Sequence, residues 1–135
     1  MKRIIKFRVW DKISKAMYNG NENKGDYTMD FEGNCYCFSD PEQKESVNED
    51  FILMQYTGIK DRNGVEIFEG DIIKNDKNLI VVVEWCLLDA TFHCYDERHK
   101  HISTWTLGHF STDNPSVIGN IHADPELIQA EQISG

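Results

Sequence analysis

Hydrophobic and polar residues alternate along several short stretches of this chain, a period-2 pattern that is typical of β-strands. The first stretch is Ile4–Trp10, and Ala16–Tyr18 can supply its return strand. Tyr27–Phe38 alternates more weakly and is interrupted at Gly33-Asn34, which predicts a second hairpin. The first 38 residues are therefore expected to form an N-terminal β extension.

The centre of the chain, Leu53–Lys74, reads LMQYTGIKDRNGVEIFEGDIIK. Asn63-Gly64 separates two β-prone runs, and this pair favours a tight hairpin because both residues tolerate positive φ. Gly70-Asp71 then interrupts the chain before Ile72-Ile73 begins another strand. The pattern predicts a strand, a tight hairpin, a strand, a sharp turn and a third strand.

A longer apolar run follows at Leu79–Leu88, with the sequence LIVVVEWCLL. Both faces of this run are apolar except at Glu84, which predicts a central strand covered on both sides. Thr91–Tyr95, Ile102–Leu107 and Val117–Ile121 predict shorter strands, joined by turns of hairpin type. Helix-forming patterns are scarce, so the expected fold is mostly β: a small antiparallel β-barrel or roll.

Two segments fall outside the strand pattern. Ser39–Asp50 is polar and acidic, and either a short helix or a flexible connection fits it. Asp124 and Pro125 stand where the N-cap and first position of a helix would be, which predicts a short C-terminal helix. We expect one domain over residues 1–135, made of an extension and acidic connection (1–50), a β-barrel core (51–122) and the helix (123–135).

Composition and charge narrow the class of protein. The chain has 135 residues, of which 40% are hydrophobic, and no run of eighteen apolar residues that could span a membrane. The N-terminal segment is too charged for a signal peptide, so we expect a cytoplasmic protein whose four cysteines are reduced. Its net charge of −9 disfavours direct binding of nucleic acid, because phosphate neutralisation supplies most of that affinity.

Three stretches resemble the signature regions of the YopX family: IKFRVWDK, ILMQYTGIKDRNGVEIFEGDIIK and VIGNIHADPEL, in the order that the family has them. Phe68 stands where a tyrosine is common in the family, and His122-Ala123 where bulkier or more acidic residues are common. The resemblance implies a cytoplasmic protein of a phage or prophage with a β-rich fold that contains an SH3-like barrel. It implies no activity, no catalytic residue and no cofactor.

The residues of these stretches have a structural and a functional interpretation. Glycines, Asn and Asp at turns permit positive φ or accept hydrogen bonds from nearby amides, and we expect this role for Gly58, Asn63, Gly64, Gly70, Asp71, Gly119 and Asn120. Tyr56, Phe68 and Trp10 are large enough to anchor a small core. The polar members are candidates for a binding surface: Gln55, Asp61, Arg62, Glu66 and Glu69.

Side chains that could bind a metal ion or act as nucleophiles are concentrated in one segment of the sequence. Cys86, His93, Cys94, His99 and His101 fall within sixteen positions, and thiolates and imidazoles are zinc ligands. However, the C-x2–4-C pairs of structural zinc sites are missing, so no metal is assigned. Adjacent His93 and Cys94 would point to opposite faces of a strand and could not act as a dyad.

Three functions remain open on these grounds. The first is a non-enzymatic module that binds a host or phage protein, with homo-oligomer formation also possible. Tyr56, Trp85, Trp105 and Phe110 would then either line a groove or fill the core. The alternatives are a small metal-dependent enzyme that uses segment 86–101, and an acidic mimic of DNA directed at a basic host protein.

Overall fold

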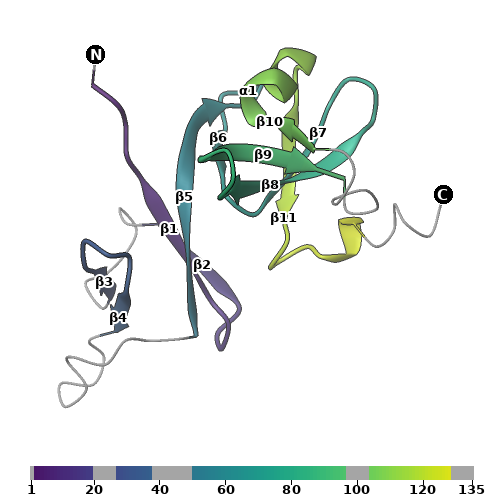
Figure 1. Ribbon diagram of the computed structural model, residues 1–135. Helices are drawn as coiled ribbons and strands as arrows, with labels where there is room; N and C mark the ends of the chain where they lie inside the picture. Colours follow the sequence, from purple (N-terminus) through teal and green to yellow (C-terminus); the bar gives the residue numbers. More distant parts are fainter. Residues whose placement is uncertain (1, 20–26, 38–49, 97–103, 129–135) are drawn as a thin grey trace. The chain divides into compact units, whose positions relative to one another are not determined.

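A computed structural model describes residues 2–19, 27–37, 50–96 and 104–128, and the fold is mostly antiparallel β, as expected (Figure 1). The chain divides into two compact units, one of residues 6–55 and one of residues 1–5 and 56–135. Within the described ranges, no helix combines the length and the apolar character needed to span a membrane.

The first unit is built around β1 (Phe7–Asp11), which pairs with β2 (Ala16–Asn19) on one side and with the first half of β5 (Phe51–Lys60) on the other. The predicted strand at Ile4–Trp10 therefore begins three residues later, and Ile4 and Ile5 are exposed. Trp10 is buried, as expected of a core anchor.

A second hairpin in this unit consists of β3 (Tyr27–Met29) and β4 (Cys35–Cys37), paired in antiparallel register. Its turn contains Gly33-Asn34, which confirms the hairpin predicted from the sequence. The acidic connection, expected as a short helix or a flexible segment, lies almost entirely outside the described residues.

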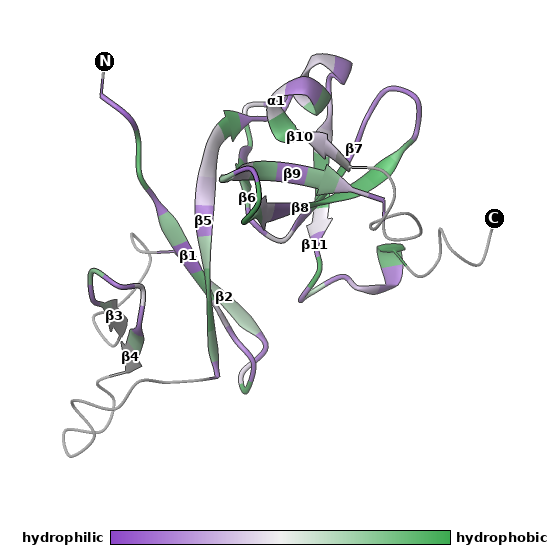
Figure 2. Ribbon diagram, in the orientation of Figure 1, coloured by the Kyte–Doolittle hydropathy of each residue, from purple (hydrophilic) through white to green (hydrophobic). Residues whose placement is uncertain are grey.

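The second unit holds a five-stranded sheet in the order β10-β9-β8-β7-β11. Its strands are β7 (Asp71–Lys74), β8 (Ile80–Cys86), β9 (Thr91–Tyr95), β10 (Thr104–Thr106) and β11 (Ser116–Asn120). The second half of β5 pairs with β6 (Glu66–Phe68). Among the described residues, one buried cluster forms the centre of this unit and consists of Ile67, Ile73, Val81, Val83, Cys94, Leu107 and Phe110. Figure 2 shows β7 and the first part of β8 as mainly hydrophobic.

Strand β8 is central, as predicted, but only its first half is covered on both faces. Val81, Val82 and Val83 are buried, whereas Glu84 and Trp85 are exposed. The difference follows the pairing, because β7 is in register with residues 80–82 only and leaves the second half of β8 paired to β9 alone. The strand ends at Cys86, so the last two leucines of the apolar run belong to the turn.

The strand expected at Ile102–Leu107 ends one residue early, at Thr106, and a short helix follows. Helix α1 (Leu107–Phe110) begins at an N-cap whose Thr106 hydroxyl accepts a hydrogen bond from the His109 amide at 3.2 Å. It continues into the 3-10 turn η2 (Ser111–Asp113). Leu107 and Phe110 face the core on one side of this helix, which the alternating pattern before it did not predict.

Three turns of the molecule are built in the same way, each over five residues: 30–34, 61–65 and 75–79. The first residue, Asp or Asn, accepts hydrogen bonds through its side chain from the amides two and four positions on. The fourth residue is left-handed: Gly33 (φ 88°), Gly64 (φ 82°) and Asn78 (φ 65°). The central hairpin is therefore not a two-residue turn with positive φ at both Asn63 and Gly64, because the Asp61 carboxylate holds a wider loop.

The C-terminal part follows β11, whose register against β7 shifts between Val117 and Gly119. This bulge lies directly before the Gly119-Asn120 pair, whose residues the sequence assigned to a turn. A helical turn covers residues 126–128, directly after Pro125, and the rest of the expected helix lies outside the described residues. The Asp124 carboxylate accepts a hydrogen bond from the Asn120 amide at 3.1 Å.

Candidate metal-ligand cluster and apolar hairpin tip

The register of β8 and β9 determines which side chains of this hairpin share a face. Glu84 lies opposite His93, and Cys86 lies opposite Thr91, so these residues share one face. Val83, Trp85, Phe92 and Cys94 share the other face, which is the face of the core. The connecting turn, residues 87–90, contains a left-handed Ala90 with φ of 52°.

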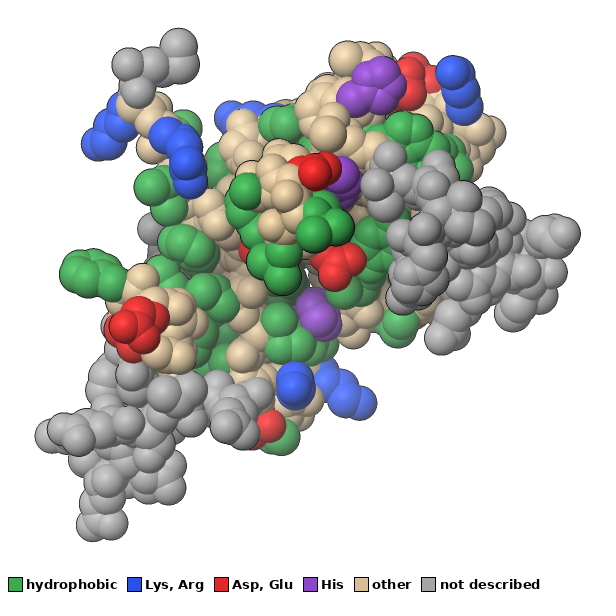
Figure 3. All heavy atoms as spheres, in the orientation of Figure 1, with side chains coloured by type: hydrophobic (Ala, Val, Ile, Leu, Met, Phe, Trp, Pro, Cys, Tyr) green, Lys and Arg blue, Asp and Glu red, His purple; other side chains and the backbone are tan. Residues whose placement is uncertain are grey.

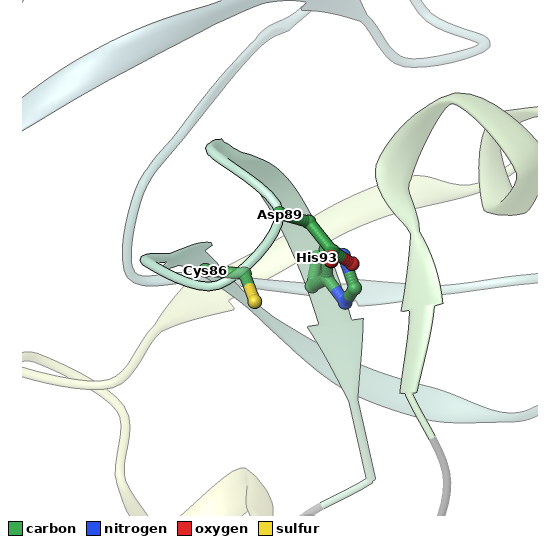
Figure 4. Close-up of side chains that lie close together, drawn as sticks. All are labelled: Cys86, Asp89 and His93. Atoms are coloured by element: carbon green, nitrogen blue, oxygen red, sulfur yellow. The ribbon is translucent and has the colours of Figure 1, made fainter.

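Three side chains with metal-binding atoms meet at the end of this hairpin, as Figure 4 shows: Cys86, Asp89 and His93. Their ligand atoms all lie within 4.8 Å of one another. The Oδ2 atom of Asp89 is 2.9 Å from Nε2 of His93, with side-chain exposures of 59% and 13%, respectively. A thiol, a carboxylate and an imidazole are thus held together by one strand pair and its turn.

The sequence singled out only part of this cluster. Cys86 and His93 do come together, but Cys94 points into the core, where burial raises the pKa of its thiol to about 12. His99 and His101 lie outside the described residues. Asp89 was not among the predicted ligands, although it lies three residues after Cys86 and four before His93, in the turn that joins their strands.

The end of the same hairpin exposes an apolar group, which we call the hairpin tip: Trp85 from β8, and Leu87 and Leu88 from the turn. Leu87 and Leu88 are 87% and 95% exposed, and Trp85 is 40% exposed. The Trp85 ring packs edge-on against the Phe92 ring with ring centroids 4.9 Å apart, and this contact fixes the position of Trp85. Figure 3 shows hydrophobic side chains at the surface in the region of this hairpin.

The aromatic side chains considered for a groove do not lie together at the surface. Tyr56 is buried and packs against Phe68 with ring centroids 5.6 Å apart. Phe110 is part of the core, and Trp105 packs against that core with its ring 6.1 Å from Phe110. Of the four aromatic residues, only Trp85 is exposed.

Asp61, a candidate for the binding surface, is buried and bonded to the backbone. Its carboxylate accepts hydrogen bonds from the amides of Asn63 (2.8 Å), Val65 (2.9 Å) and Val117 (2.9 Å). Burial alone would raise the pKa of Asp61, but these three amides, with help from the Arg62 charge, hold the pKa below its usual value. Asp61 therefore joins two segments of the fold and presents no surface for a partner.

The other four candidates for the binding surface are divided between the two units, with Gln55 in the first and the other three in the second. Gln55 is in register with Phe7 in the first unit. Arg62 is exposed and forms an ion pair with Asp76 at 3.1 Å, and Glu66 lies opposite Lys60 across β5 and β6. Glu69 is half-buried in the turn between β6 and β7.

Most of the candidate turn residues either adopt a positive φ or accept hydrogen bonds from backbone amides. Gly58 and Gly70 have φ values of 87° and 84°, and the Asp71 carboxylate accepts a hydrogen bond from the Phe68 amide at 2.8 Å. A Cβ on Gly119 would lie 2.6 Å from the Asp124 carboxylate. The Asn120 side chain accepts hydrogen bonds from the amides of His122 and Ala123, which secures the turn after β11.

Comparison with known proteins agrees with this fold. The crystal structure of protein EF1440 from Enterococcus faecalis is similar, with a TM-score of 0.58 and 27% sequence identity over 94% of this chain and 99% of that chain. No curated protein matches the sequence. The family model described as YopX protein matches residues 6–129. Because this match covers nearly the whole chain, the protein belongs to the YopX family.

Proposed function

We propose that this protein is a non-enzymatic protein-binding module, an accessory protein of a phage or prophage that works in the bacterial cytoplasm. Its contact surface is the hairpin tip, and its partner is a host or phage protein. The observation that carries this proposal is the exposure of Leu87 and Leu88, at 87% and 95%, beside a half-exposed Trp85.

Two adjacent leucines at the end of a hairpin are unusual in physical terms, because turns are commonly made of Gly, Asn, Asp, Pro and Ser. Single exposed apolar residues are normal, but a contiguous apolar group indicates a contact surface. Burying one leucine side chain contributes about 1.5–3 kcal/mol. Tryptophan is among the residues that most often dominate the binding energy of protein interfaces. The tip thus offers the anchor residues of a small interface.

The charges around the tip indicate the chemistry of the partner. Glu84 and Asp89 flank the apolar residues, and both are exposed. The whole chain carries a net charge of −9. An apolar groove bordered by lysine or arginine would complement this arrangement, because opposite potentials steer association and exclude wrong partners.

The proposal is tested by capturing partners from host lysate with the tagged protein, after nuclease treatment, and by comparing two variants. Leu87→Ser/Leu88→Ser removes the apolar group from the tip. Ile13→Ser removes an aliphatic side chain of similar exposure, 74%, from the other unit and is the matched control. We expect a recurrent partner that binds the wild type and Ile13→Ser and is lost with the double serine variant.

Other outcomes would change the proposal. A partner that binds all three proteins equally would place the contact elsewhere, with the polar residues Arg62, Glu66 and Glu69 of the second unit as the next candidate. A partner that is lost at moderate salt in every case would favour charge mimicry of DNA. Recovery of the protein itself as the partner would identify a homo-oligomer.

A further inference from the structure

We propose that Cys86, Asp89 and His93 bind a divalent transition-metal ion, with Zn²⁺ as the best fit. The proposal concerns the face of the hairpin opposite the core, and it does not depend on the protein-binding function. It rests on three ligand atoms of different chemistry within 4.8 Å of one another.

The ligand types suit zinc better than a hard cation. Zn²⁺ is bound by cysteine thiolate, histidine nitrogen and carboxylate oxygen, usually in four-coordinate geometry, whereas Mg²⁺ and Ca²⁺ prefer oxygen ligands alone. One thiolate and one carboxylate carry two negative charges, which neutralise a divalent ion. Three protein ligands leave a fourth position for water.

The distances require only a small adjustment. Two ligands bound to tetrahedral zinc at about 2.0–2.3 Å lie roughly 3.5 Å apart. The Asp89 oxygen and His93 Nε2 are 2.9 Å apart and must separate slightly, and the Cys86 sulfur already lies within 4.8 Å of the other two ligand atoms. Asp89 belongs to an exposed turn, so its side chain can move without disturbing the core.

The scaffold already holds two of the ligands in place. Cys86 and His93 stand on adjacent paired strands, which fixes their backbone separation. The Nε2 atom of His93 is buried and lies 2.9 Å from the Asp89 carboxylate, so it faces this second ligand of the cluster. Glu84, opposite His93 on the same face, adds negative charge that attracts a cation.

Metal binding at this site would act on the hairpin tip. Leu87 and Leu88 lie between Cys86 and Asp89 in the sequence, so the metal would close a short loop around them. Closing a loop removes conformational freedom from the backbone within it. The ion would therefore hold the two exposed leucines in a defined position.

The site is tested by titrating the full chain with Co²⁺ and Zn²⁺ after treatment with chelator and reductant. Co²⁺ should bind with a stoichiometry of one and give a thiolate-to-cobalt charge-transfer band together with the intense visible bands of four-coordinate cobalt. Cys86→Ser should abolish the charge-transfer band. His93→Ala should weaken Zn²⁺ binding about 100-fold or more, since even loss of an outer-sphere partner costs about 10–100-fold.

Matched controls separate this site from other thiols and imidazoles. His109→Ala removes an exposed histidine from α1, and His99→Ala/His101→Ala removes two that the structure does not describe; binding should survive in both. Circular dichroism of Cys86→Ser and of His93→Ala checks that each variant is folded. The proposal is overturned if micromolar Zn²⁺ does not bind, or if folded Cys86→Ser binds it as the wild type does.

Discussion

The side chain of Asp61 accepts a hydrogen bond from the backbone amide of Val117, 56 positions further along the chain, at 2.9 Å. The same carboxylate holds the loop after β5 through the amides of Asn63 and Val65. A backbone hydrogen bond from Arg62 to the carbonyl of Pro115, at 3.1 Å, supports the connection. A signature residue of the family thus closes the fold between its central hairpin and its last strand.

Replacing Asp61 with alanine should lower the free energy of unfolding by about 2–4 kcal/mol. The change leaves three backbone amides without their acceptor, and a hydrogen bond to a charged group contributes about 1.5–3 kcal/mol. Asn63 and Val65 are exposed, so water can replace the acceptor for their amides and the loss stays below the sum of three full bonds. Urea unfolding measures the difference. Asp76→Ala is the control, because its exposed ion pair with Arg62 should contribute about 0–1 kcal/mol. Equal losses in the two variants would contradict this role of Asp61.

Asp61 should also make stability depend on acid pH. Its pKa is lower in the folded protein than in the unfolded chain, where aspartate titrates at about 3.9. The folded state therefore binds fewer protons, so the contribution is present above that value and is lost as the pH falls through the lower, folded pKa. Asp61→Asn should reduce the dependence of unfolding free energy on pH in this acidic window. An unchanged dependence would show that other carboxylates cause it.

Gly119→Ala should destabilise the protein by about 1–3 kcal/mol, a typical cost of overpacking. The new Cβ would meet Asp124 Oδ2 at 2.6 Å and Leu127 Cδ1 at 2.8 Å, and Asp124 is bonded to the Asn120 amide. Gly108→Ala in α1 is the control, since no neighbouring atom lies within 4 Å of its Cβ. Thermal unfolding should show a lower midpoint for Gly119→Ala alone. A similar midpoint in both variants would contradict this prediction, since it would mean that the Asp124 side chain moves aside without a loss of stability.

The cysteines should differ in their reactivity toward an alkylating reagent. Cys94 is fully buried and burial raises its pKa to about 12, so it should stay unmodified in the folded protein. Cys35 is also buried, and burial, with a smaller effect of Asp30, raises its pKa. Of these three cysteines, Cys86 is half-exposed and should react first, more slowly when Zn²⁺ is present. Peptide mass spectrometry locates the label, and modification of Cys86 at equal rates with and without Zn²⁺ would count against the metal site.

The strands were largely predictable because their signals are local. Thr91–Tyr95 alternates and is bounded by turns, and the structure has the strand with the same bounds. The start of α1 was not predictable, because Leu107 continues the alternation of β10, whereas the helix depends on the Thr106 cap and on the packing of Phe110 into the core. The end of β8 was missed for a similar reason, since Leu87 is as apolar as the buried valines and only the pairing with β9 ends the strand.

The candidate site was predictable only in part. Cys86 and His93 were recognised as ligand types. They are seven positions apart, and this spacing alone does not show that they share one face of the hairpin. The register of the hairpin does, by placing Cys86 beside Thr91 and Glu84 beside His93. Asp89 joins them through the conformation of the turn, which depends on where β8 ends.

The central claim, that the hairpin tip contacts a partner, is tested most directly by photo-crosslinking in the cells in which the protein is naturally made. A photoreactive phenylalanine analogue replaces Leu88 in one variant and Ile13, an exposed residue of the other unit, in a second. We predict one major adduct with the analogue at position 88 that does not form with it at position 13. No adduct at position 88, or the same adducts at both positions, would contradict the account.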